Sequence, residues 1–206
     1  MPAMDYSRIA RFYDAYVTTD FDVAFFVREA AGASSVLELM CGTGRVSIPL
    51  IEAGVSLTCV DNSPEMLAGL RRKLADRGLS ACVRDMDVCD LSFERQFDLA
   101  IIPFHAFAEI VPERAQQQAL AAIHRVLSDD GRFICTLHNP AVRLRSVIGQ
   151  RVERGRYELP AGEGTLSVDA VEHHDAATHI VRGTQFYEVQ DAGGAVRSRE
   201  SIDIQF

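Results

Sequence analysis

Short apolar runs and amphipathic stretches alternate along the first 140 residues of the chain. The apolar runs predict five strands, at 35–39, 55–60, 81–84, 97–102 and 132–137. Around them, apolar side chains recur three and four residues apart, which predicts helical segments at 5–32, 45–53, 64–77 and 113–127. Strands that alternate with helices of this length need crossover connections. The pattern therefore predicts an α/β fold with a doubly wound, mostly parallel sheet.

The sequence changes in character after residue 140. Residues 143–155 are polar and rich in arginine, and after them apolar and polar positions alternate. The alternating segments are 166–174, 179–190 and 195–206. A hairpin turn at Asp191–Gly194 joins the last two, which indicates an antiparallel arrangement. We therefore divide the chain into a helical N-terminal cap (1–34), an α/β core (35–140) and a C-terminal antiparallel β appendage (141–206).

Composition narrows the class of protein. The 206 residues carry a net charge of −8, from 21 lysine and arginine residues against 29 aspartate and glutamate residues. Nucleic acid is not an expected partner, because binding it requires a cationic surface that neutralises phosphates. No apolar run approaches the roughly 18 residues that span a bilayer, and the first five residues lack a signal-peptide pattern. Five cysteines without a CxxC pair predict free thiols and a cytoplasmic protein.

Acidic residues and glycines follow the first three predicted strands, at the edge where ligands collect in an open parallel sheet. The segment 38–44 reads ELMCGTG, and its glycines let the backbone approach a ligand at a helix start. Asp61 ends the second strand, where its carboxylate can accept hydrogen bonds from both hydroxyls of a ribose. Asp85 follows the third strand, and its carboxylate with the adjacent N–H of Met86 can read the amino edge of an adenine.

Five segments in chain order carry a resemblance to a known family. They are 36–44, 60–67, 84–86, 97–104 and 126–132. Together they resemble the class I S-adenosylmethionine-dependent methyltransferases of the small-molecule type, over about residues 5–140. The resemblance implies methyl transfer from S-adenosylmethionine to an oxygen, nitrogen or carbon of a small-molecule acceptor. It also implies a cofactor site made of Tyr13, Glu38, Met40, Gly42, Gly44, Asp61, Asn62, Met66, Asp85, Met86 and Pro103.

A nicotinamide dinucleotide is the rival cofactor for such a fold. Its Gly-x-Gly-x-x-Gly pattern would place a third glycine three residues after Gly44, and Ser47 stands there instead. A carboxylate as close to the loop as Glu38 would also repel a pyrophosphate. The family itself usually has a glycine at the start of its loop where this chain has Met40.

Each of these residues also has a purely structural interpretation. Glu38 can fix the loop by hydrogen bonds, and Asp61 can cap the turn before Ser63. Asp85 can belong to a solvated acidic loop, and Tyr13 can be an ordinary packing residue of a helix. The sequence alone leaves these alternatives open.

His105 and His138 follow the fourth and fifth predicted strands and are the candidate catalytic residues. A neutral imidazole there can accept a proton from an oxygen or nitrogen nucleophile, although a structural role or one in shaping the acceptor site is the more common use of such histidines. We expect no metal at His173, His174 and His179, because adjacent strand residues point to opposite faces. The arginines between residues 143 and 156 predict a surface paired with carboxylates, or a gate for an anionic acceptor.

Members of the family usually continue past the antiparallel insertion with a further helix and two strands. The chain stops at residue 206, in an apolar alternation, so we expect this terminal part of the fold to be missing. The free sheet edge and the apolar face of the appendage then predict a homodimer. A non-catalytic module for S-adenosylmethionine binding or oligomerisation is the alternative function.

Overall fold

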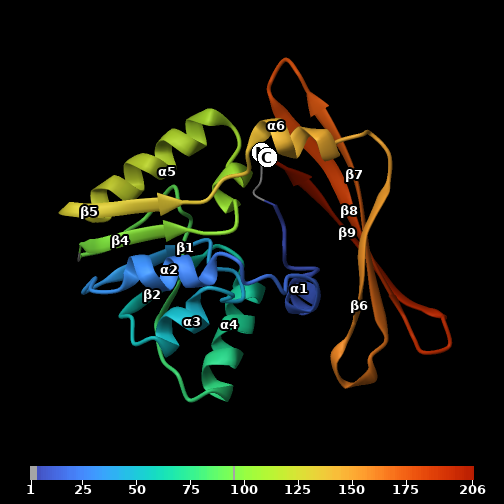
Figure 1. Ribbon diagram of the computed structural model, residues 1–206, viewed down its shortest axis with the longest axis horizontal. Helices are drawn as coiled ribbons and strands as arrows, with labels where there is room; N and C mark the ends of the chain where they lie inside the picture. Colours follow the sequence, from blue (N-terminus) through green and yellow to red (C-terminus); the bar gives the residue numbers. More distant parts are fainter. Residues whose placement is uncertain (1–3, 95) are drawn as a thin grey trace. The chain divides into compact units, whose positions relative to one another are not determined.

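A computed structural model of the protein describes residues 4–94 and 96–206 (Figure 1). The described residues form two compact units. Residues 19–137 make up the core unit, and residues 4–18 together with 138–206 make up the appendage unit. The predicted helical cap of residues 1–34 therefore divides between the two. Residues 1–3, on which part of the signal-peptide expectation rests, lie outside the described residues.

The core unit is built on a five-stranded parallel sheet in the order β3-β2-β1-β4-β5. Its strands are β1 (Val36–Leu39), β2 (Leu57–Asp61), β3 (Cys82–Asp85), β4 (Phe97–Ile102) and β5 (Leu127–Cys135). The chain passes from the central β1 to β2 on one side, and β4 pairs with β1 on the other. The carboxyl end of β1 is thus the switch point at which open α/β sheets bind ligands. This arrangement confirms the predicted fold class.

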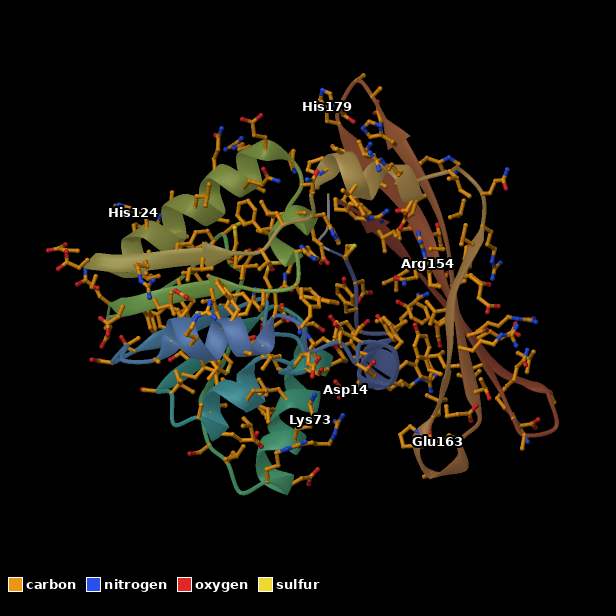
Figure 2. All side chains as sticks on the ribbon, in the orientation of Figure 1. Asp14, Lys73, His124, Arg154, Glu163 and His179 are labelled. Atoms are coloured by element: carbon orange, nitrogen blue, oxygen red, sulfur yellow. The ribbon has the colours of Figure 1, made fainter. Side chains whose placement is uncertain are left out.

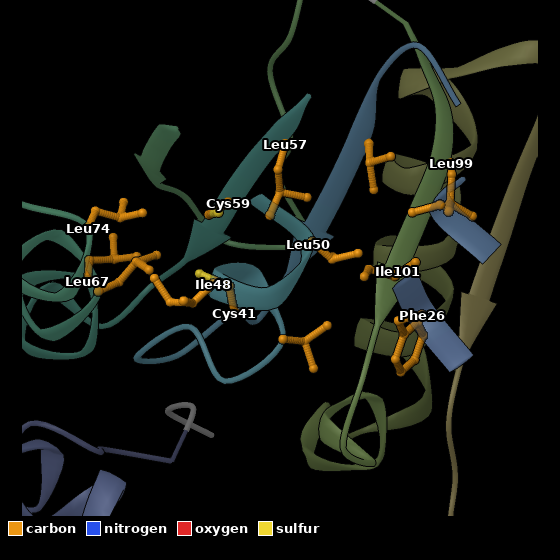
Figure 3. Close-up of a cluster of buried hydrophobic side chains, with 14 residues drawn as sticks. Phe26, Cys41, Ile48, Leu50, Leu57, Cys59, Leu67, Leu74, Leu99 and Ile101 are labelled. Carbon is orange, nitrogen blue, oxygen red and sulfur yellow. The ribbon is translucent and has the colours of Figure 1, made fainter. Parts of the chain in front are cut away.

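Helices cover both faces of the sheet, because successive strand residues point to opposite faces. The helices are α2 (Val23–Ala30), α3 (Ser47–Glu52), α4 (Pro64–Asp76), α5 (Glu113–Val126) and the short 3-10 turn η1 (Ala106–Glu109). On one face α2, α3 and α4 contribute Phe26, Leu50 and Leu70 to a buried cluster (Figure 3). On the other face Leu37 and Leu39 of β1 belong to a second cluster with residues of α5.

The entry to α4 shows why the strand ends are well defined. Ser63 has extended backbone angles and its hydroxyl accepts a hydrogen bond from the N–H of Met66 at 3.4 Å, as an N-cap does. Pro64 occupies the first helical position, where a missing N–H costs nothing. The predicted helix start is therefore confirmed, and β2 has to end directly before it, at Asp61.

The appendage unit contains an antiparallel sheet in the order β6-β7-β8-β9. Its strands are β6 (Val152–Glu158), β7 (Thr165–Asp175), β8 (Ile180–Gln190) and β9 (Val196–Gln205). Its helical segments are α1 (Ala10–Tyr16), α6 (Pro140–Arg143) and the 3-10 turns η2 (Leu144–Ser146) and η3 (Pro160–Gly162). Leu166, Val168 and Ala170 are buried at alternate positions of β7. The predicted antiparallel appendage is confirmed.

Strand β6 is the element that the hydrophobic pattern missed. Most of it is exposed, and it pairs along the edge of the sheet with β7. Its stabilisation comes from the ladder and from ion pairs with β7 rather than from apolar burial. Arg154 (Figure 2) lies 2.9 Å from Glu172, and Arg151 at the start of the strand lies 2.7 Å from Asp169. A strand held in this way resembles a polar loop in the sequence.

Candidate functional site

The loop that joins β1 to α3 has the backbone geometry of a glycine loop. Met40, Gly42 and Gly44 all have positive φ angles, of 55°, 55° and 86°. At Gly44 a Cβ would lie 2.4 Å from Cδ1 of the fully buried Leu70, so a side chain there would displace Leu70 in addition to being disfavoured by φ. Met40 adopts the conformation that glycine prefers, and its half-buried side chain packs against the second buried cluster. The methionine therefore leaves the course of the loop intact.

Asp61 ties this loop to the end of β2. One carboxylate oxygen accepts a hydrogen bond from the N–H of Gly42 at 2.7 Å, and the other accepts one from the N–H of Ser63 at 2.9 Å. Burial raises the pKa of Asp61, and the backbone donors oppose that effect by favouring the charged form. The turn-capping interpretation of Asp61 is thus observed. Each oxygen still has a second lone pair for a ligand hydroxyl.

Glu38 lies in the middle of β1, on the face that α3 covers. Its side chain is 1 % exposed and accepts a hydrogen bond from the hydroxyl of Ser47 at 2.6 Å. Burial raises the pKa of Glu38 to about 8, and the hydroxyl of Ser47 and the charge of Arg45 only partly counteract this. The carboxyl group of Glu38 therefore stays protonated up to a much higher pH than the carboxyl group of an exposed glutamate. The hydrogen bond to Ser47 also ties β1 to the first turn of α3.

Only one of the two predicted adenine contacts after β3 is free in the structure. The N–H of Met86 donates to the backbone carbonyl of Asp61 at 3.1 Å, so it is engaged in the sheet. An adenine contact therefore rests on the carboxylate of Asp85, which is exposed. Asn62 is exposed as well, whereas Met66 is 3 % exposed and packs inside the core unit. Pro103, directly after β4, is buried.

A buried ion pair at the mouth of the loop was not predicted from the sequence. The two terminal guanidinium nitrogens of Arg45, Nη1 and Nη2, donate to Oδ1 and Oδ2 of Asp22, the second of them at 2.9 Å. Arg45 also donates to the carbonyl of Thr19 at 3.0 Å and lies over the ring of Phe104, 4.5 Å from its centroid. Burial disfavours the ionised Asp22, but Arg45 outweighs burial and holds its pKa below the usual value.

Asp22 occupies the N-cap position of α2, but its side chain makes no capping hydrogen bond. The carboxylate is used for Arg45 instead. An arginine directly after the glycine loop was the available signal, and nothing in the local pattern identified its partner.

His105 lies just beyond β4, at the same edge of the sheet as Glu38 and Asp61. Phe104 and His105 both have left-handed backbone angles, with φ of 57° and 65°, a conformation that costs energy outside glycine. The two rings stack with centroids 6.1 Å apart, and the N–H of His105 donates to the hydroxyl of Thr136 at 3.4 Å. Burial lowers the pKa of His105, which favours a neutral imidazole near pH 7.

Two predicted site residues belong to the appendage unit. Tyr13 makes edge-to-face contacts with Tyr6 and Tyr16, at centroid distances of 6.0 and 5.4 Å. His138 is exposed and begins the segment that leads to α6. A role for either residue in the cofactor or acceptor site remains a prediction.

Four of the five arginines between residues 143 and 156 lie within ion-pair distance of a carboxylate. Arg143 lies 2.8 Å and Arg154 2.9 Å from the buried Glu172, and Arg156 lies 3.2 Å from Glu153. Within residues 4–94 and 96–206, no three histidine, cysteine, aspartate or glutamate side chains are grouped as a metal site would need. In the same part of the chain, no helix has the length and apolar character required to cross a membrane.

Comparison with known proteins places this geometry in a family. A model of methyltransferase domains matches residues 36–131. A glycine/sarcosine N-methyltransferase from Parasynechococcus marenigrum is 32% identical over 143 residues, which make up 68% of this chain and 50% of that protein. The chain spans about half the length of the curated relatives it matches.

Solved structures share the fold over nearly the whole chain. An S-adenosylmethionine-dependent methyltransferase from Clostridium acetobutylicum superposes with a TM-score of 0.79 at 19% identity, covering 97% of this chain and 80% of that one. The sugar N-methyltransferase KedS8 from a Streptoalloteichus species superposes with a TM-score of 0.73 at 23% identity, covering 99% and 79%. The sheet order, the glycine loop held by an acidic strand end and these matches agree. The chain belongs to the class I S-adenosylmethionine-dependent methyltransferase family.

Proposed function

We propose that the core unit binds S-adenosylmethionine at the carboxyl edge of its sheet and that the protein transfers the methyl group to an amine nitrogen of a small molecule. The glycine loop held by Asp61 carries this proposal. One carboxylate oxygen of Asp61 accepts a hydrogen bond from the N–H of Gly42 at 2.7 Å, and Glu38 is buried in β1 just before the loop. The carboxylate of Asp61 suits a ligand that has a sulfonium and an ammonium group and no phosphate, and a protonated Glu38 does not oppose such a ligand. The cation of the loop, Arg45, is already paired with Asp22.

The residues present fit this cofactor. A Cβ built on Gly42 would meet no atom within 4 Å, so the backbone of the loop is open to a ligand at that point. The remaining lone pairs of Asp61 would accept hydrogen bonds from the ribose hydroxyls. The carboxylate of Asp85 would accept a hydrogen bond from the amino group of the adenine. The rest of the proposed site consists of Glu38, Met40, Gly44, Asn62, Met86 and Pro103, with Tyr13 and Met66 as further candidates.

The bound cofactor supplies a methyl carbon that its sulfonium sulfur makes electrophilic. The tasks left to the protein are to orient the acceptor, to exclude water and to take up a proton. His105 is our candidate for the base, because burial favours its neutral form and because it lies at the carboxyl edge of the sheet. His138 is a second candidate. A nitrogen acceptor is supported by two similar proteins that are named N-methyltransferases, for glycine/sarcosine and for a sugar.

We also propose a cytoplasmic homodimer. All five cysteines are free thiols, as a reducing compartment would require. Strands β6 and β9 are the edges of the appendage sheet, and edge strands pair readily with a second copy unless they are blocked.

Calorimetric titration of the protein with S-adenosylmethionine and with S-adenosylhomocysteine tests the binding half of the proposal. Asp61→Ala should weaken binding by roughly 10- to 150-fold, because losing a charge-assisted hydrogen bond costs about 1.5–3 kcal/mol. Asp76→Ala, at the exposed end of α4, is the matched control and should bind as the wild type does. Equal affinity in the wild type and in folded Asp61→Ala would refute the assignment.

Transfer itself is tested with cofactor that carries a radiolabelled methyl group and a panel of small amines. Label that moves to an amine supports the enzyme. Binding without transfer to any amine of the panel would favour the non-catalytic module instead.

A further inference from the structure

The ion pair between Asp22 and Arg45 is buried, which is unusual for two charged side chains. The side chain of Asp22 is 4% exposed and that of Arg45 is 14% exposed. Such a pair contributes little net stability, because desolvation of both charges offsets most of their attraction. A carboxylate and a guanidinium that are held together out of water therefore call for an explanation other than stability.

The pair connects three separate segments of the core unit. Asp22 stands at the start of α2, and Arg45 belongs to the glycine loop. The guanidinium of Arg45 lies over the ring of Phe104, which follows β4. Phe104 in turn stacks on His105. These contacts connect the carboxylate of Asp22 to Phe104 and His105. We call these two residues, which follow β4 and include the candidate base, the Phe104–His105 corner.

That corner needs support. Two consecutive residues with left-handed angles, neither of them glycine, are strained and persist only when surrounding contacts fix them. The guanidinium over the ring of Phe104 and the hydroxyl of Thr136 at the N–H of His105 provide such contacts. Arg45 is itself held by both carboxylate oxygens of Asp22 and by the carbonyl of Thr19, so the carboxylate is the charged part of this anchor.

The charges of the pair also reach the imidazole. Burial is the largest influence on His105 and lowers its pKa, the anion of Asp22 raises it, and the cation of Arg45 lowers it. The hydrogen bond with the backbone of Leu137 raises it further. Removal of one member of the pair therefore changes the affinity of His105 for a proton, and the direction depends on which member is removed.

We propose that Asp22 is a positioning residue for His105: through Arg45 it holds the Phe104–His105 corner, and its negative charge stabilises the imidazolium that forms when His105 takes a proton from the acceptor. This inference rests on the proposed function. In the step concerned, the nitrogen–hydrogen bond of the methylated acceptor breaks, its electron pair stays on nitrogen, and the proton becomes bound to the imidazole. The imidazolium then lies near an ion pair whose carboxylate compensates the new charge.

The test is the titration of His105, followed by NMR in protein with ¹³C-labelled histidine. The chain has six histidines, and His105→Gln identifies the resonance that belongs to position 105. Asp22→Asn should lower the titration midpoint of His105, because the anion is lost and the cation of Arg45 stays. Arg45→Gln should raise it wherever Asp22 stays ionised, because the cation is lost, and the carboxyl resonance of Asp22 in protein with ¹³C-labelled aspartate shows the pH range in which it is ionised. Asp20→Asn, an exposed aspartate two residues away, is the matched control and should leave the midpoint unchanged.

Shifts of opposite sign in the two variants support the proposal, since a purely structural role would not give them. Unchanged midpoints, or shifts of the same sign, overturn it. If Asp22→Asn fails to fold, Arg45→Gln still decides by its sign, and the double variant Asp22→Asn/Arg45→Gln, without buried charges, should have a midpoint above that of Asp22→Asn where both can be measured. Calorimetry with S-adenosylhomocysteine on the wild type reports separately on the proposed function, so failure of cofactor binding is distinguishable from failure of the role of Asp22.

Discussion

The buried Glu38 makes a quantitative prediction about stability and pH. Burial raises the pKa of Glu38 from an ordinary 4.5 to about 8 in the folded protein. A group whose pKa is higher in the folded state stabilises the fold fully below its unfolded pKa and loses that contribution as the pH rises through its folded pKa. The contribution of Glu38 to the free energy of unfolding should therefore decline between about pH 4.5 and pH 8. One pKa unit corresponds to about 1.4 kcal/mol, so the full decline is roughly 5 kcal/mol.

Glu38→Gln removes the titration and keeps the shape of the side chain. The amide oxygen of glutamine can still accept the hydrogen bond from Ser47, which glutamate accepts at 2.6 Å. Near pH 5 the variant and the wild type should have similar free energies of unfolding, because both are uncharged at this position when folded. At pH 9 the variant should be more stable by several kcal/mol, since it does not have to bury a carboxylate.

Urea unfolding at pH 5, 7 and 9, followed by circular dichroism, measures this difference. The slope of the free energy against urea should agree between the two proteins, so that a change in midpoint reports stability. Glu65→Gln, at an exposed position of α4, is the control and should show no pH-dependent gain. A variant that is less stable than the wild type by the same amount at all three values would refute the reasoning. It would mean that Glu38 is ionised and stabilised in the folded state.

Three further predictions concern the loop, the base and the assembly. Gly44→Ala should destabilise the protein by about 1–3 kcal/mol more than Gly54→Ala. Both glycines have positive φ, but only at Gly44 would a Cβ lie 2.4 Å from Leu70. Equal losses of melting temperature in the two variants would contradict this. Once an acceptor is known, His105→Gln should reduce turnover by roughly 10²–10⁴ with cofactor affinity unchanged, and His138→Gln takes over this expectation if His105→Gln retains the wild-type rate. Sedimentation equilibrium at micromolar concentration should detect a dimer, and a single species of 22.7 kDa would exclude the proposed assembly.

The sheet of the core unit could be predicted because its signals are local. Strand β4 was expected at residues 97–102 and lies at Phe97–Ile102, and helix α5 was expected at 113–127 and lies at Glu113–Val126. In both, apolar spacing alone determines which face is buried. Strand β5 begins earlier than expected, at Leu127, which pairs with Phe97; residues 128–131 lie at a register shift, and regular pairing with β4 resumes at Arg132, where the strand was expected. Strand β6 was missed because its polar residues are held by pairing with β7 and not by apolar burial.

In the site too, local features could be predicted and long-range contacts could not. The acidic and glycine positions at the strand ends follow from the order of elements, so Glu38 and Asp61 could be identified from the sequence. The capping of the turn at Ser63 by Asp61 was among the sequence interpretations, but the hydrogen bonds of Asp61 to Gly42 and of Glu38 to Ser47 could not be identified. The hydrogen bond of Asp61 to Gly42 spans 19 residues, and the engagement of the Met86 N–H with Asp61 depends on the register of β2 and β3. Register is a property of two paired strands, so the sequence of either strand alone does not determine it.

The pair of Asp22 and Arg45 shows where prediction from one sequence ends and why. The sequence shows Asp22 and Arg45 only as members of the predicted helical segments 5–32 and 45–53, and neither segment indicates a partner for the other. In the structure Asp22 makes no capping hydrogen bond, and Arg45 turns back to the segment before α2. Contacts of this kind join residues 23 positions apart, with α2 and β1 between them. They are also the contacts that we propose to act on the conformation and protonation of His105, and only the tertiary structure reveals them.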